Sequence, residues 1–358
     1  MKYRLSLRRK LALEIFRKIK SGIVKEHPLK EIFWECTLRC NLHCRHCGSD
    51  CREVSSFRDM PEEDFLKVLD SVRSRLDPHK VFVVITGGEP LVRPDLVECG
   101  RDIYEKGFPW GLVTNGFALD EKKFSSLLHA GMRSVTISLD GIGETHDWMR
   151  GRSGSFRRAS DAIGIVSACR DIVSDVVTCV NKRSYCELDE IKSLLISKGV
   201  KQWRLFTVFP LGRAARDPEL QISDEQFRGL MEFIRRTRKE GLIKASYGCE
   251  GFLGNYEGEV RDSFFFCRAG VTVGSVLADG SISSCPSIRS DYHQGNIYRD
   301  DFMDVWNNRF RCYRDREWMK TGSCKDCDYF RYCHGNGFHL RASDGKLLVC
   351  HMERLKNK

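Results

Sequence analysis

Residues 32–47 read IFWECTLRCNLHCRHC, and this stretch decides the fold because a short strand runs directly into a cluster of cysteines. Residues 32–35 predict the strand, and Cys40, Cys44 and Cys47 follow it with the spacing CxxxCxxC. Three thiolates on one loop can hold three irons of a cubane and leave the fourth iron open, whereas zinc sites pair CxxC knuckles. The spacing therefore predicts an iron–sulfur cluster after the first strand.

Short β-rich runs alternate with longer helical patterns from residue 30 to about residue 240. Such alternation is typical of parallel βα units. The predicted strands cover residues 32–35, 81–86, 110–114, 134–139, 173–180 and 202–209. Six units are too few for a closed eight-stranded barrel. We therefore expect an α/β fold with a partial (β/α)6 TIM-type barrel, whose chemistry lies at the carboxyl ends of the strands.

Polar residues follow the ends of the predicted strands. Gly87, Gly88 and Glu89 end the second strand, where glycines let a backbone approach a ligand and a carboxylate accepts hydrogen bonds from an ammonium group. The candidates on later strand ends are Asn115, Ser138 and Arg150. Each of these residues alone also suits an ordinary turn. Their joint occurrence on one rim predicts a ligand site.

The cysteine spacing and the GGEP sequence of residues 87–90 resemble the radical S-adenosylmethionine (SAM) superfamily. The resemblance implies that the open iron of a 4Fe–4S cluster binds the methionine part of SAM. It also implies reductive cleavage of SAM to a 5'-deoxyadenosyl radical, with electrons from a flavodoxin- or ferredoxin-type donor. His46 departs from the family, which often has an aromatic residue before the third cysteine. The cofactor-binding residues implied are Gly87, Gly88, Glu89, Asn115, Ser138 and Arg150.

A second group of cysteines follows residue 245, where the sequence becomes aromatic and Gly-rich. Cys324, Cys327 and Cys333 form a CxxCxxxxxC run, and Cys350 follows after a gap. Four thiolates would complete a closed cluster, and the same spacing also suits a structural zinc ribbon.

The order of these cysteines resembles the SPASM extension of radical SAM enzymes, since Cys267, Gly280 and Cys285 precede the run. The resemblance implies at least one auxiliary 4Fe–4S cluster on the four later cysteines, and metal ligation by Cys267 and Cys285. Gly337 stands where the pattern has another cysteine. We expect a second auxiliary cluster to survive, with its remaining ligands drawn from Cys249, Cys312 and His339.

Three segments are expected: a basic helical extension over residues 1–30, a radical SAM partial barrel over 31–240 and a SPASM-like auxiliary cluster domain over 245–358. The extension mixes leucine and isoleucine with basic residues. This pattern suits docking on an anionic membrane, but packing against the underside of the barrel is the interpretation we favour.

The sequence and its composition argue against a secreted protein and against a disulfide scaffold. The chain has 358 residues, 17 cysteines and a formal charge of +10. Its N-terminus lacks the apolar run of a signal peptide, so the protein is expected to be cytoplasmic. An odd number of cysteines in a long chain of this kind indicates cluster or metal ligation rather than a disulfide scaffold.

The expected reaction is hydrogen abstraction from a peptide or protein substrate. The resemblance implies this substrate class, because SPASM extensions occur often in radical SAM enzymes that modify peptides. A tetrapyrrole- or heme-maturing enzyme of the same architecture is one alternative. A zinc- or Fe–S-containing regulator that binds nucleic acid is another, since basic residues attract phosphates. The turn at residues 87–90 disfavours that regulator, so no nucleic-acid partner is expected.

Overall fold

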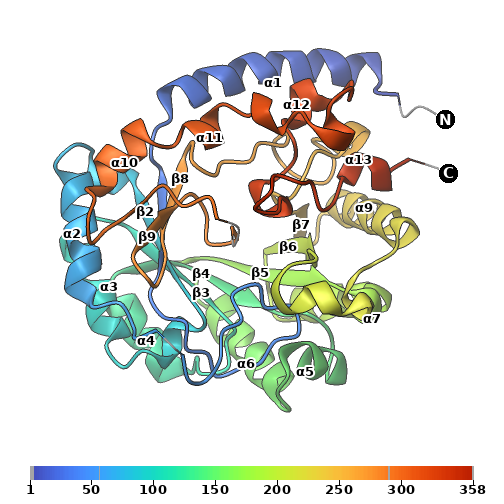
Figure 1. The fold of residues 1–358 in the computed structure, drawn as a ribbon. Helices are drawn as coiled ribbons and strands as arrows, with labels where there is room; N and C mark the ends of the chain where they lie inside the picture. The colour runs from blue at the N-terminus through green and yellow to red at the C-terminus, as the bar shows by residue number, and fades with distance from the viewer. Residues whose placement is uncertain (1–3, 56, 289–290, 357–358) are drawn as a thin grey trace.

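The computed structural model describes residues 4–55, 57–288 and 291–356. Its centre is one sheet in the order β10-β9-β8-β1-β2-β3-β4-β5-β6-β7 (Figure 1). The strands are β1 Glu31–Glu35, β2 Phe82–Thr86, β3 Trp110–Thr114, β4 Met132–Ser138, β5 Val173–Val180, β6 Gln202–Thr207, β7 Lys244–Tyr247, β8 Val273–Val276, β9 Ser281–Ser283 and β10 Gly295–Asn296. All six predicted strands are present, and β1 to β7 pair in parallel, which confirms the α/β fold class.

Helices connect the parallel strands and cover one face of the sheet (Figure 1). They are α2 Glu62–Arg73, α3 Leu96–Glu105, α4 Glu121–His129, α5 Glu144–Arg150, α6 Ser155–Ala168, α7 Lys182–Cys186, α8 Leu188–Ser197 and α9 Asp224–Glu240. Alternate strand residues face these helices, as Trp34 does when it stacks on Phe65 with ring centroids 4.4 Å apart. A capping box of Ser223 and Gln226 starts α9.

The C-terminal third adds strands to the barrel sheet. Strand β8 pairs in parallel with β1, and β9 and β10 continue antiparallel. The remaining helices are short: α10 Phe302–Asn308, α11 Arg311–Arg314, α12 Phe330–Cys333 and α13 His351–Arg354. Arg75, just after the end of α2, donates to Asp304 of α10 at 2.8 Å. The division into segments at residues 30 and 240–245 stays a prediction.

Helix α1 (Leu7–Glu26) begins at the cap Ser6 and runs beside α12 (Figure 1). Its inner face packs on the C-terminal third, where Phe16 meets Phe264 edge-on and Tyr332 donates to Glu14 at 2.7 Å. The prediction that this helix packs against the underside of the barrel was therefore wrong. Aromatic residues of the C-terminal third provide the surface that α1 covers.

The opposite face of α1 is open to solvent. Leu7, Leu11, Ile15 and Ile19 lie four residues apart and are 84%, 65%, 57% and 55% exposed. Side chains at this spacing share one helix face. Within the described residues, no helix combines the length and apolar character that crossing a membrane requires.

Candidate active site

The loop after β1 carries the first cysteine cluster. Cys40 is buried beside Leu42 and Cys51, and its N–H donates to the carbonyl of Arg52 at 2.8 Å. The N–H of Cys47 donates to the carbonyl of Cys44 at 3.3 Å. These bonds fold the loop back on itself. The structure thus gathers Cys40, Cys44 and Cys47 on one turn.

The two glycines after β2 fit against the cysteine loop. The N–H of Gly88 donates to the carbonyl of Thr37 at 2.8 Å, and the N–H of Glu89 donates to that of Arg39 at 2.9 Å. A Cβ on Gly87 would lie 2.4 Å from the Thr37 oxygen, and one on Gly88 would lie 2.3 Å from the Arg39 oxygen. The glycines therefore allow close approach to the cysteine loop itself. The sequence had suggested close approach to a ligand.

Glu89 is buried at the centre of the rim. Its carboxylate accepts from the N–H of Leu91 at 3.1 Å, from Thr114 Oγ1 at 2.7 Å and from the N–H of Asn115 at 2.7 Å. Burial nevertheless raises its pKa above the usual range. The Asn115 side chain donates to Asn41 at 2.8 Å. Strands β2 and β3 are thereby tied to the cysteine loop.

Arg150, near the end of α5, meets Asp140 in the interior. Its Nη2 lies 2.7 Å from Asp140 Oδ2, and its Nη1 lies 3.7 Å from Cys44 Sγ. The same carboxylate accepts from the N–H of Cys179 at 2.8 Å. Although burial opposes ionisation, Arg150 and the neighbouring histidines hold the pKa of Asp140 below its usual range. Asp140 therefore holds Arg150 in position.

This pairing of Asp140 with Arg150 was not predicted from the sequence. The sequence signal that could have indicated it is a carboxylate, Asp140, directly after a predicted strand, followed by Arg150 on the next helix. Ser138 ends β4 in register with Val177 of β5. Two buried nitrogens at this rim, His46 Nδ1 and Arg150 Nε, have no hydrogen-bond partner within the described residues. Unpartnered buried donors of this kind fit a polar ligand at the rim.

The pKa values of the three rim thiols are shifted in different directions. Burial raises the pKa of Cys40 to about 12 and also raises that of Cys44. A hydrogen bond from Cys51 lowers the pKa of Cys47 below the usual range of a thiol. The contact of Cys51 with Cys47 could not be predicted from the cysteine spacing. Metal binding displaces thiol protons, so this donor set suits a cluster that binds thiolates.

The four later cysteines all line one cavity of about 1060 Å³. Donors point at two of these sulfurs: Arg341 Nη2 lies 3.5 Å from Cys324 Sγ, and the N–H of Asn336 lies 3.1 Å from Cys333 Sγ. Such donors stabilise thiolate charge around clusters. The members of the set are Cys324, Cys327, Cys333 and Cys350. One cavity lined by four thiols fits an auxiliary cluster.

A further thiol group lies near Gly337. Burial, together with the neighbouring Cys249 and Cys267 thiols, raises the pKa of Cys285 to about 12. The N–H of Gly337 donates to the carbonyl of Glu250 at 2.7 Å, directly after Cys249. Among the described residues, no three His, Cys, Asp or Glu side chains are arranged to hold a single metal ion.

Comparisons with known proteins match both halves of the chain. The model of the radical SAM superfamily matches residues 34–195, and that of the SPASM iron–sulfur cluster-binding domain matches residues 267–328. The AdoMet-dependent heme synthase of Methanosarcina barkeri is 28% identical over 88% of this chain and 93% of that protein. The mycofactocin maturase MftC of Mycolicibacterium smegmatis is 29% identical over 84% of this chain and 76% of that protein.

Solved structures share the fold. Streptococcus suis SuiB bound to S-adenosylmethionine has a TM-score of 0.69 at 17% identity, covering 90% of this chain and 77% of that one. The structure of anSMEcpe with bound AdoMet has a TM-score of 0.69 at 21% identity, covering 91% and 90%.

Proposed function

Because this chain belongs to the radical SAM superfamily and carries a C-terminal SPASM domain, we propose that Cys40, Cys44 and Cys47 hold the SAM-binding 4Fe–4S cluster. When bound, such a cluster supplies the electron that cleaves SAM to a 5'-deoxyadenosyl radical. The observation that carries this proposal is the rim itself, where Glu89, Asn115 and Arg150 are tied to the cysteine loop.

The rim residues bind and orient SAM in this proposal. Glu89 offers carboxylate oxygens to the ammonium group, and Arg150 offers a guanidinium to the carboxylate. Asp140 keeps Arg150 in place through its 2.7 Å ion pair. Gly87 and Gly88 hold Glu89 against the loop, while Asn115 and Ser138 face the rest of the cofactor. Preorganised groups of this kind reduce the reorganisation needed in the reaction.

We propose a peptide or protein as the substrate. The similarity to a relative named mycofactocin maturase supports this choice, and SuiB, which shares the fold, has been solved bound to the precursor peptide SuiA. A second candidate is a tetrapyrrole, because the similarity to an AdoMet-dependent heme synthase covers nearly the whole of both proteins. The regulator alternative is dropped, since the matched family and relatives are enzymes.

The test is anaerobic co-expression with the peptides encoded beside the gene, followed by mass spectrometry, and incubation of the purified enzyme with iron porphyrins. A mass shift in a peptide that disappears with Cys44→Ala supports the first candidate. Conversion of a porphyrin without any peptide shift rejects it and supports the second.

At least one auxiliary cluster is proposed on Cys324, Cys327, Cys333 and Cys350. For a second one, Cys249, Cys267 and Cys285 supply three thiols. A Cβ on Gly337 would lie 2.6 Å from His339 Cε1, so the imidazole fills the space of the missing cysteine. Burial lowers the pKa of His339 to about 4, and its Nε2 has no partner within the described residues. We therefore propose His339 as the fourth ligand.

Iron counting decides the number of clusters. Three 4Fe–4S clusters give about twelve irons per chain, and two give about eight. Nitrogen coupling in the pulsed electron paramagnetic resonance spectrum, lost in His339→Ala, supports histidine ligation. A count of about eight irons in fully reconstituted protein rejects the second auxiliary cluster. We also propose that the protein is cytoplasmic and that a flavodoxin- or ferredoxin-type protein donates the electron.

A further inference from the structure

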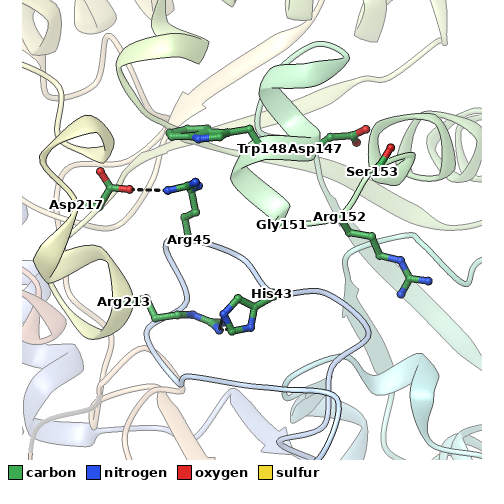
Figure 2. A pocket seen from close by; sticks show the side chains of 9 residues that line it. All are labelled: His43, Arg45, Asp147, Trp148, Gly151, Arg152, Ser153, Arg213 and Asp217. Carbon is green, nitrogen blue, oxygen red and sulfur yellow. Dashed lines mark hydrogen bonds and ion pairs between the residues drawn. The ribbon is translucent and has the colours of Figure 1, made fainter.

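A pocket of about 610 Å³ lies beside the cysteine loop, and Figure 2 shows the side chains that line it. Its lining comes from the loop, from α5 and the turn after it, and from the segment after β6: His43, Arg45, Asp147, Trp148, Gly151, Arg152, Ser153, Arg213 and Asp217. None of these residues belongs to the SAM-binding set proposed above. The pocket therefore requires a separate explanation.

The cysteine loop contributes His43 and Arg45 to the lining of this pocket. The N–H of His43 donates to the carbonyl of Arg150 at 3.1 Å, and the N–H of Arg45 donates to that of Met149 at 2.9 Å. A Cβ on Gly151 would lie 2.4 Å from the His43 oxygen, so the two segments are in close contact. His43 and Arg45 flank Cys44 in sequence. A molecule in the pocket thus sits one residue away from a cluster ligand.

Positive charge gathers around Trp148. The guanidinium carbons of Arg45 and Arg183 lie 4.8 Å and 3.9 Å from its ring centroid. Two like charges over one ring repel each other, and an anionic partner relieves that repulsion. Arg152 adds a third exposed guanidinium, stacked 4.1 Å from the Phe117 ring centroid.

The acids of the pocket offset this charge only in part. Asp147 accepts from the N–H groups of Gly154 and Phe156 at 2.6 Å and 2.7 Å, which fixes it at the start of α6. Asp217 pairs with Arg45 at 3.3 Å. The outer rim therefore presents arginines to an approaching partner.

We propose that this arginine-rimmed pocket is the docking site for a small acidic protein that carries one electron, of the ferredoxin or flavodoxin class. The proposal rests on the proposed function, because the rim cluster must be reduced before SAM is cleaved. One electron leaves the carrier, which is oxidised, and enters the cluster, which is reduced. No bond forms or breaks in this step. Complementary charge steers such encounters and mainly raises the association rate.

The test compares two reductants in one assay. Arg45→Glu with Arg183→Glu reverses the charge beside Trp148, and Arg101→Glu with Lys122→Glu makes the same change in net charge on exposed residues of α3 and α4. Formation of 5'-deoxyadenosine is measured with photoreduced acidic ferredoxin and, separately, with excess dithionite. Binding of oxidised ferredoxin is measured by calorimetry at low and high salt.

With ferredoxin, we expect the Arg45/Arg183 variant to lose at least about tenfold in rate and in affinity at low salt, and the control pair to keep both. With dithionite, both variants should match the unaltered enzyme. An equal loss with dithionite overturns the proposal, because the arginines would then act on the cluster or SAM. An unchanged ferredoxin rate and affinity also overturns it. Absence of product from the unaltered enzyme with dithionite instead rejects the proposed function, while the calorimetry still reports on docking.

Discussion

The cysteine loop after β1 and the four cysteines near the C-terminus present thiols in two different ways. The loop is held by backbone hydrogen bonds, such as the one from Gly88 to Thr37, and by glycines that permit contact between two backbones. The C-terminal thiols instead line a cavity to which α1 also contributes Lys10, and the side chain of Arg341 points at Cys324. Backbone contacts fix the geometry needed to orient a cofactor. A cavity lined by four thiols needs only to enclose a cluster.

The largest effect is expected from breaking the buried pair beside the loop. Asp140→Asn leaves Arg150 buried without its charge partner, which destabilises a fold by about 3–5 kcal/mol. Urea unfolding of the anaerobic apoprotein measures the change, with Asp161→Asn, an exposed acid on α6, as the control. Equal unfolding midpoints for the two variants would contradict the assigned role of Asp140.

The next effect concerns the contact between the two backbones at the rim. Gly88→Ala places a Cβ 2.3 Å from the Arg39 oxygen and must displace the loop. We expect 5'-deoxyadenosine formation to fall about 100-fold, as small displacements of reacting groups can produce. Gly164→Ala is the matched control, since its Cβ would approach only Lys198 Nζ at 3.7 Å. Full activity of Gly88→Ala would mean that the loop tolerates movement.

The C-terminal thiols should be separable from SAM cleavage. Cys350→Ala is expected to lose about four irons per chain and to keep 5'-deoxyadenosine formation under dithionite, because its cavity is distinct from the rim. Cys186→Ala, on an exposed thiol of α7, should change neither quantity. Iron analysis and product quantification check both variants. Loss of product in Cys350→Ala would show that the two regions depend on each other.

A further effect, on stability alone, is expected within α1, which covers the C-terminal region. Leu13→Ala should destabilise the protein by about 2–5 kcal/mol because Leu13 is buried there. Leu11→Ala, on the exposed face, should stay within about 0.5 kcal/mol of the unaltered protein. Thermal unfolding of the two variants compares the loss of stability on the buried and the exposed face of α1. Similar destabilisation by both would contradict the packing of α1.

The sequence predicted the six barrel strands and both cysteine sets because strand periodicity and cysteine spacing are local signals. It did not predict that β7 and β8 extend the sheet, since β8 pairs with β1 across more than 200 residues. The pairing of Asp140 with Arg150 and the contact of Cys51 with Cys47 were also missed. These contacts depend on tertiary geometry. The predicted packing partner of α1 was wrong for the same reason.

SAM cleavage by the anaerobically reconstituted enzyme under excess dithionite tests the proposed cluster site most directly. We expect 5'-deoxyadenosine from the unaltered protein and from Cys350→Ala. We expect none from the variant in which Cys40, Cys44 and Cys47 are all alanine. Product from that triple variant, or no product from the reconstituted unaltered enzyme, would contradict the assignment of the loop after β1 as the site of SAM cleavage.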